Sequence, residues 1–165
     1  MRCEDINETL ADERSQYDII VTNSFLHHIP DYAGLIQRTI GLLSSQGIFF
    51  SFQDPLRYDS MKRLPMMFSM ASYFWWRAFK GDAIGGLRRR LRRRRGIYLE
   101  GSVHDNAEYH VTRNGVDQDA IRTIFEKKGF DCRIIRYFST QSRLFQPIGT
   151  LIGVKNTFAV IAKKS

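Results

Sequence analysis

A short apolar run is followed at once by side chains that could bind a ligand and move a proton. The run YDIIV (17–21) leads into Asn23 and Ser24, and two histidines follow, His27 and His28. Amide and hydroxyl groups can donate to a carboxylate or accept from an ammonium group, although the same residues are common in polar turns. Imidazole exchanges a proton near neutral pH, so one histidine is a candidate base or orienting donor. The other is then structural, because adjacent side chains on a turn point in different directions.

These residues require a sheet to position them. An apolar run bounded by polar and turn residues predicts a strand buried on both faces. Ligands of open parallel sheets bind beyond the carboxyl ends of the strands, where residues 23–28 would lie. Asp31 is placed to cap a helix over 32–45 that ends before Gly47. The next strand is predicted over 47–53, and Asp54-Pro55 closes it.

The rest of the chain predicts an insertion followed by two strands and two helices. Residues 56–101 are too many for a plain loop, so we interpret them as a helical cap over the carboxyl edge of the sheet, with one helix or two short helices over 64–79. Asp117 is a plausible N-cap for the best-patterned helix, and Gly129 a plausible stop. The later elements are a helix over 117–128, a strand over 131–138, a helix over 144–152 and a final strand over 157–162.

The order of these elements resembles a known family. YDIIVTNSFLHHIPD, a helix ending in SSQG and the strand IFFSFQDP are similar to the middle of a class I S-adenosylmethionine-dependent methyltransferase. The resemblance covers residues 3–55 well and the last third more loosely. It implies an α/β fold with a partial Rossmann-like sheet, mostly parallel with an antiparallel last strand. Residues 1–165 would form a single truncated domain, with 56–101 as the cap insertion.

The resemblance also implies a reaction and its residues. S-adenosyl-L-methionine would be the cofactor, and a small molecule would accept the methyl group. Methyl transfer is an in-line displacement that depends above all on alignment, and it needs a base only when the acceptor must lose a proton. No cluster of ligands in the sequence supports a metal site. The candidates are Asp5 and Ile6 beside the adenine, Asn23 and Ser24 at the other end of the cofactor, His27 and His28 in catalysis, and Asp54, Tyr58, Tyr109 and His110 on the acceptor side.

One departure from the family pattern is large. The glycine-rich loop that follows the first strand of the family is missing, and the sequence resembles the family only from near the end of its third strand. The chain therefore resembles the carboxyl-terminal half of the domain, either as a fragment or as one piece of a split protein. Its first strand would then expose a hydrogen-bonding edge. We expect such a chain to bind S-adenosylmethionine weakly or not at all by itself.

The charge of the chain points to an alternative function. The net charge is +8, and seven of the 25 basic residues are arginines in the run 88–95. A basic, aromatic-bearing module without enzymatic activity could bind an anionic membrane or nucleic acid through this run. Nucleic acid is disfavoured because no aromatic residue interrupts the arginines. Two distant cysteines and a polar, acidic N-terminus suit a cytoplasmic protein, with peripheral membrane binding through the run as an option.

Overall fold

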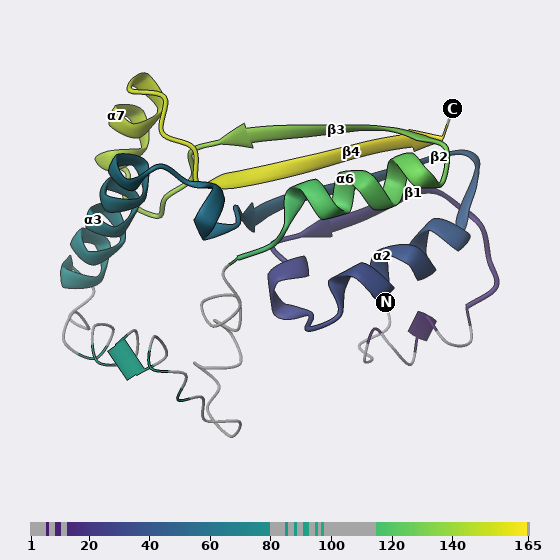
Figure 1. Cartoon of the computed structure of the whole chain (residues 1–165), viewed down its shortest axis with the longest axis horizontal. Helices are drawn as coiled ribbons and strands as arrows, with labels where there is room; N and C mark the ends of the chain where they lie inside the picture. The colour runs from purple at the N-terminus through teal and green to yellow at the C-terminus, as the bar shows by residue number, and fades with distance from the viewer. Residues whose placement is uncertain are drawn as a thin grey trace.

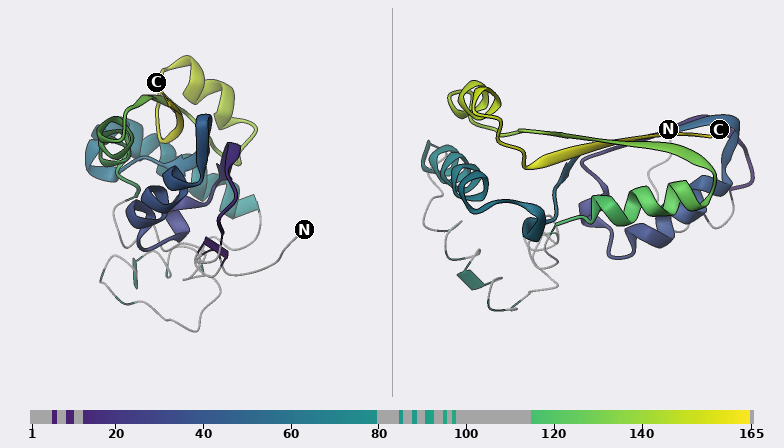
Figure 2. Two further views of the ribbon diagram at one scale, coloured as in Figure 1. Left: turned by 90° about the vertical axis from the view of Figure 1, so that its right-hand side faces the viewer. Right: turned by 45° about the horizontal axis from the view of Figure 1, so that its top comes forward.

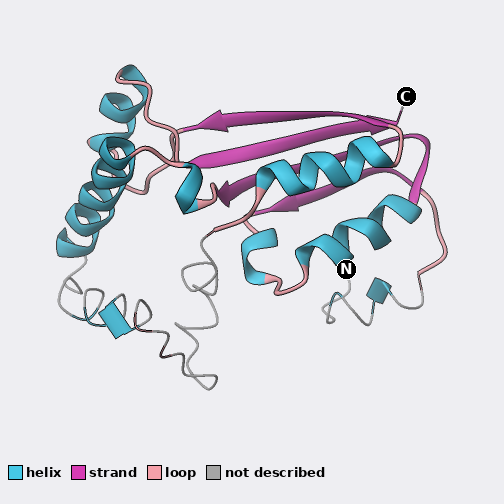
Figure 3. Cartoon of the chain, in the orientation of Figure 1, coloured by secondary structure: helices cyan, strands magenta, loops and turns pink. Residues whose placement is uncertain are grey.

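The computed structural model describes residues 6, 9–10, 13–79, 85, 88, 91–92, 95, 97 and 115–164. Its centre is a four-stranded sheet in the order β1-β2-β4-β3 (Figures 1 and 3). β1 (Tyr17–Asn23) pairs in parallel with β2 (Leu43–Pro55). β4 (Thr157–Lys164) lies antiparallel between β2 and β3 (Phe130–Tyr137). Three strands therefore share one direction and the last strand opposes them, which confirms the predicted sheet.

Two helices cover one face of this sheet. α2 (Tyr32–Gly41) and α6 (Gln118–Lys127) lie side by side below it in the right-hand view of Figure 2. Phe125 of α6 packs on Phe49 of β2 with ring centroids 5.0 Å apart. Asp31 and Asp117 cap the two helices as predicted, each accepting backbone N–H groups of the first turn. The core of the described residues lies between these helices and the sheet.

The helix after β1 is shorter than predicted. It ends at Gly41 instead of residue 45, and β2 already begins at Leu43. The Ser44 hydroxyl donates to Asp18 at 2.8 Å across the start of the β1–β2 pair. Serine favours such local contacts over a helix interior, and burial of the Leu43 side chain anchors the early strand. The Gly47 stop signal was therefore misread, because this glycine lies inside β2.

The prediction that the first strand is buried on both faces is wrong. Ile19 is 62% exposed and Val21 is 55% exposed. β1 is the edge strand of the described sheet, with β2 as its partner. An apolar sequence reports that a strand is suited to burial, but a neighbour must be present to bury it.

Two further helices lie beyond the carboxyl ends of β1 and β2 (Figure 1). α3 (Arg63–Phe79) confirms the helix predicted in the insertion, and α7 (Phe145–Leu151) confirms the helix before the last strand. Phe68 of α3 contacts both Phe138 and Phe145, so the two helices form one layer. Two short 3-10 helices, η1 (Leu26–His28) and η2 (Tyr58–Ser60), follow β1 and β2. Within the described residues, no helix is long and apolar enough to cross a membrane.

Candidate functional site

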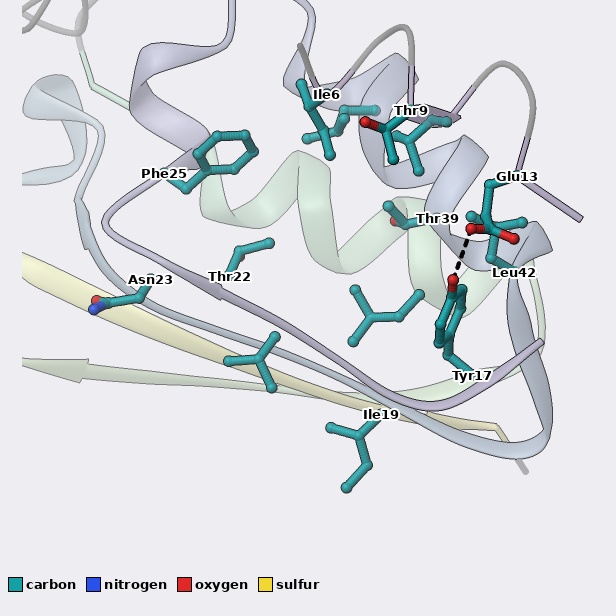
Figure 4. A pocket seen from close by; sticks show the side chains of 14 residues that line it. Ile6, Thr9, Glu13, Tyr17, Ile19, Thr22, Asn23, Phe25, Thr39 and Leu42 are labelled. Carbon is teal, nitrogen blue, oxygen red and sulfur yellow. Dashed lines mark hydrogen bonds between the residues drawn. The ribbon is translucent and has the colours of Figure 1, made fainter. Parts of the chain in front are cut away.

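A pocket of about 470 Å³ runs along β1 (Figure 4). Two residues that the sequence placed at the cofactor, Ile6 and Asn23, both line it. Asn23 lies at one end of the groove, and the Tyr17–Glu13 pair lies at the other (Figure 4). Most of the wall between them is apolar side chain from β1, α2 and the N-terminal segment. Of the other two predicted cofactor residues, Ser24 is not among the lining residues of the pocket, and Asp5 lies outside the described residues.

The carboxyl end of β1 has an unusual backbone. Ser24 adopts a φ of 50°, the left-handed region that residues other than glycine rarely occupy. Its N–H donates to the Phe52 carbonyl at 2.8 Å, which ties this turn to β2. Asn23 and Ser24 are both exposed. Strained backbone of this kind concentrates at binding sites, where the surrounding structure holds it in place.

One hydroxyl in the pocket wall lacks a partner. Thr22 Oγ1 is buried and makes no hydrogen bond within the part of the chain that the structure describes. Buried polar atoms are almost always satisfied, so an exception needs an explanation. A polar group on a molecule bound in the pocket would supply one.

The pair of strand ends is joined by a buried acid. His27 Nδ1 lies 2.8 Å from Asp54 Oδ1, and the backbone N–H of His27 donates to the same oxygen at 3.2 Å. The Ser51 hydroxyl donates to the other carboxylate oxygen of Asp54 at 2.9 Å. Asp54 is fully buried and His27 is 9% exposed. Both oxygens of Asp54 therefore have partners inside the protein, and Oδ1 holds the ring of His27.

The second histidine lies over the first. The ring centroids of His27 and His28 are 3.9 Å apart, with an angle of 45° between the ring planes. His28 is half-buried, whereas His27 is almost fully enclosed. The two rings therefore lie against each other and do not point in different directions, as we had expected of adjacent residues on a turn, although His28 is the more exposed of the two.

The structure describes two of the four predicted acceptor-side residues, Asp54 and Tyr58. Asp54 sits in the buried contact just described, and Tyr58 lies half-buried in η2. Tyr109 and His110 fall outside the described residues, as does most of the arginine run 88–95. The close contact that the structure does make, between Asp54 and His27, joins residues that the sequence analysis had assigned to different roles.

Sequence reasoning missed a polar cluster at the end of β2. Gln53 has a φ of 67°, at an irregularity in the pairing of β2 with β4. Its N–H donates to the Tyr137 hydroxyl at 3.0 Å, and its side-chain oxygen accepts from the Ser139 hydroxyl at 2.9 Å. A left-handed glutamine has no signature in sequence, because glycine and asparagine are the residues expected there.

The far end of the pocket is held by an acid with strong hydrogen bonds. The N–H and hydroxyl of Ser15, together with the Tyr17 hydroxyl, lower the pKa of Glu13 to about 2. The Tyr17 bond spans 2.8 Å and fastens the segment before β1 to the strand. Among the described residues, no group of three or more histidine, cysteine or acidic side chains could hold a metal ion.

The fold and the comparisons agree on a class of protein. A parallel strand pair, an antiparallel last strand between its neighbours and polar strand ends define a methyltransferase-like α/β domain. The family model described as "Methyltransferase domain" matches residues 3–133. The chain therefore belongs to the methyltransferase domain family, of the class I S-adenosylmethionine-dependent type. The comparison with curated proteins finds no match.

Proposed function

We propose that this chain forms part of a site that transfers a methyl group from S-adenosyl-L-methionine to a small molecule. The supporting observation is that Ile6 and Asn23 line one pocket. The family resemblance assigns these residues to opposite ends of the cofactor, so a single bound molecule would contact both. The histidines of η1 follow Asn23 by only four residues.

The residues of the pocket suit this cofactor. Ile6, Leu10 and Phe25 offer apolar surface for an adenine ring. Asn23 offers an amide for the amino-acid part, and the unpartnered Thr22 hydroxyl offers a further polar contact. When bound, S-adenosyl-L-methionine supplies a methyl group on a positively charged sulfur, and the acceptor atom bonds to that carbon as the sulfur–carbon bond breaks.

The two histidines then divide the remaining work. We assign His27 a positioning role, since its ring nitrogen and backbone N–H are both bonded to buried Asp54. His28 is the more exposed ring and packs on His27, so it is the better candidate to take the proton that the acceptor loses. Asp54 acts through His27 and does not touch the acceptor in this assignment.

Nuclear magnetic resonance provides the test of cofactor binding, because it detects weak complexes in a 19.3 kDa protein. Amide resonances of the ¹⁵N-labelled chain are followed as S-adenosyl-L-methionine is raised to millimolar concentration. We expect shifts at Ile6, Asn23 and Ser24, none at Cys132 on the opposite edge strand, and smaller shifts for Asn23→Ala. An unchanged spectrum around β1 would rule the pocket out.

The catalytic assignment predicts different outcomes for the two histidines. His28→Gln should lower the methyl-transfer rate about 100-fold or more, with an unchanged melting temperature. His27→Gln should lower the melting temperature as well, because it alters a buried hydrogen-bonded pair. The rate is measured as release of S-adenosylhomocysteine with a panel of hydroxyl, thiol and amine acceptors. An unaffected rate in His28→Gln would remove the base from the proposal.

The open side of the pocket sets the expected affinity. The cofactor would lie along β1, whose far edge has no neighbouring strand in the described sheet. We therefore expect the 165-residue chain by itself to bind S-adenosyl-L-methionine more weakly than micromolar. Calorimetry that gave a micromolar dissociation constant would contradict this expectation.

A further inference from the structure

α3 exposes apolar side chains along its length. After the exposed Arg63, the exposed positions 64, 67, 71, 75, 78 and 79 recur at helical spacing, so they share one face. Every one of them is apolar: Leu64, Met67, Ala71, Trp75, Ala78 and Phe79. The buried residue of the helix is a serine, Ser72, which lies 3.2 Å from the Thr140 hydroxyl.

α7 also exposes apolar side chains. It docks on the protein through Gly149, where an added Cβ would meet the Phe138 ring at 2.3 Å, and through Gln146, which bonds the backbone of residues 138 and 140. Large side chains of α7 and of the two residues that flank it face solvent: Leu151 is 88% exposed, Leu144 before the helix 56% and Ile152 after it 59%. A surface helix normally presents its polar side to water, so both helices leave an apolar face to be covered.

The two apolar faces meet. The Trp75 ring lies 6.0 Å from Phe145, the first residue of α7, and 5.2 Å from Phe79. Figures 1 and 2 show the two helices side by side at one end of the sheet. We call the exposed apolar residues of α3 and α7, together with Leu144 and Ile152 beside α7, the helix-pair face.

The charge around this face selects its partner. Residues 60–79 and 138–156 contain five basic residues and no acidic residue: Lys62, Arg63, Arg77, Arg143 and Lys155. The arginine run 88–95 follows α3 in the chain, and its described ends, Arg88 and Arg95, are exposed. Apolar side chains with a tryptophan, next to basic residues, match the boundary between acyl chains and anionic headgroups.

We propose that the helix-pair face docks on the surface of an anionic lipid bilayer. α3 has 17 residues, about 25 Å of helix, and would lie in the plane of the interface. Leu64, Phe79 and Leu151 would enter the acyl boundary, while the five basic residues would contact the headgroups. The proposal is independent of the methyl-transfer site, because it uses none of the pocket or histidine residues.

The chain carries its own probe for this contact. Both of its tryptophans, Trp75 and Trp76, lie on α3. Vesicles of phosphatidylcholine alone are compared with vesicles that also contain phosphatidylglycerol. We expect the anionic vesicles to blue-shift the tryptophan emission, to sediment the protein and to release it as salt is raised. Lipids brominated near the headgroup should quench the emission. Equal binding to both vesicles, or no quenching, would overturn the proposal.

Paired variants distinguish binding through the helix-pair face from non-specific binding to vesicles. Leu64→Gln with Leu151→Gln should weaken vesicle binding by about ten-fold or more at an unchanged melting temperature, because both side chains are already in water. Ile135→Gln, an exposed residue of β3, is the apolar control. Lys62→Glu with Arg143→Glu should also weaken binding, and Lys127→Glu with Lys128→Glu at the end of α6 should not. Losses of equal size in the controls, or tighter binding to a DNA duplex than to the vesicles, would refute the docking.

Discussion

Asp54 is the residue on which the candidate site depends most directly. It accepts hydrogen bonds from the His27 backbone and from Ser51, and it lies 2.8 Å from the His27 ring. These contacts join the turn after β1 to the end of β2. Since the carboxylate is fully buried, each partner that loses it would be left in a place that water does not reach.

Replacement of this acid should therefore be costly. We expect Asp54→Ala to lower the free energy of unfolding by about 3 kcal/mol or more, measured by urea denaturation. Asp59→Ala is the matched control, because the Asp59 side chain is 71% exposed and its pair with Arg57, at 3.9 Å, lies on the surface. That control should change stability by less than about 0.5 kcal/mol. Equal losses in the two variants would show that the buried contact contributes little.

At the scale of elements, α6 is the helix whose formation is best explained. Asp117 caps it by accepting from Asp119 and Ala120, and its side chain pairs with Arg57 at 2.6 Å. Partial burial raises the pKa of Asp117, but the Ala120 N–H and Arg57 outweigh it, so the pKa lies below its usual 3.8. Val116 and Ile121, on either side of the cap, are buried in the core.

The lowered pKa gives this cap a pH dependence. A carboxylate with a depressed folded pKa stabilises the protein above its unfolded pKa, and this contribution disappears as the pH falls through the folded value. Asp117→Ala should cost about 1 kcal/mol at neutral pH and almost nothing in acid. Asp117→Ser, which keeps a capping oxygen, should lose less at neutral pH. Urea midpoints at the two pH values give the comparison, and a loss that persists unchanged in acid would contradict it.

At the scale of the whole molecule, the two edges of the described sheet differ. β3 carries Asp131, Arg133 and Arg136, and charged side chains of this kind discourage pairing with another sheet. β1 exposes Ile19 and Val21 and lines the pocket. α2 and α6 cover one face of the sheet, whereas the Phe50–Phe52 stack on the other face is only half-buried. The β1 side of the sheet therefore leaves apolar side chains in contact with water.

Exposure of this edge should make the isolated chain associate with itself. As protein concentration rises, the unaltered chain should sediment faster because it associates. Ile19→Lys with Val21→Lys should keep the chain closer to the monomer, because a charged edge opposes strand pairing. Ile135→Lys on β3 should have little effect, since that edge already carries charges. Sedimentation that is independent of concentration in the unaltered chain would show that the β1 edge is not sticky.

Local patterns in the sequence determined most of the elements. Asp31, Asp117 and Gly129 marked helix ends correctly, because capping depends on backbone groups a few residues away. The period of apolar residues located α3, α6 and α7, and the order of elements indicated the methyltransferase sheet. Of the candidate site residues that the structure describes, Ile6 and Asn23 line one pocket, and their assignment to the cofactor stays a prediction.

Contacts between distant residues were decided by the tertiary structure alone. No local pattern could show that Asp54 would be buried against His27, 27 positions away, or that Gln53 would adopt a left-handed backbone under Tyr137. The same holds for β1 and α3, whose apolar residues predicted burial although the fold leaves many of them in water. Hydrophobicity in a sequence records which residues gain by being covered, whereas the neighbours that do or do not cover them exist only once the chain has folded.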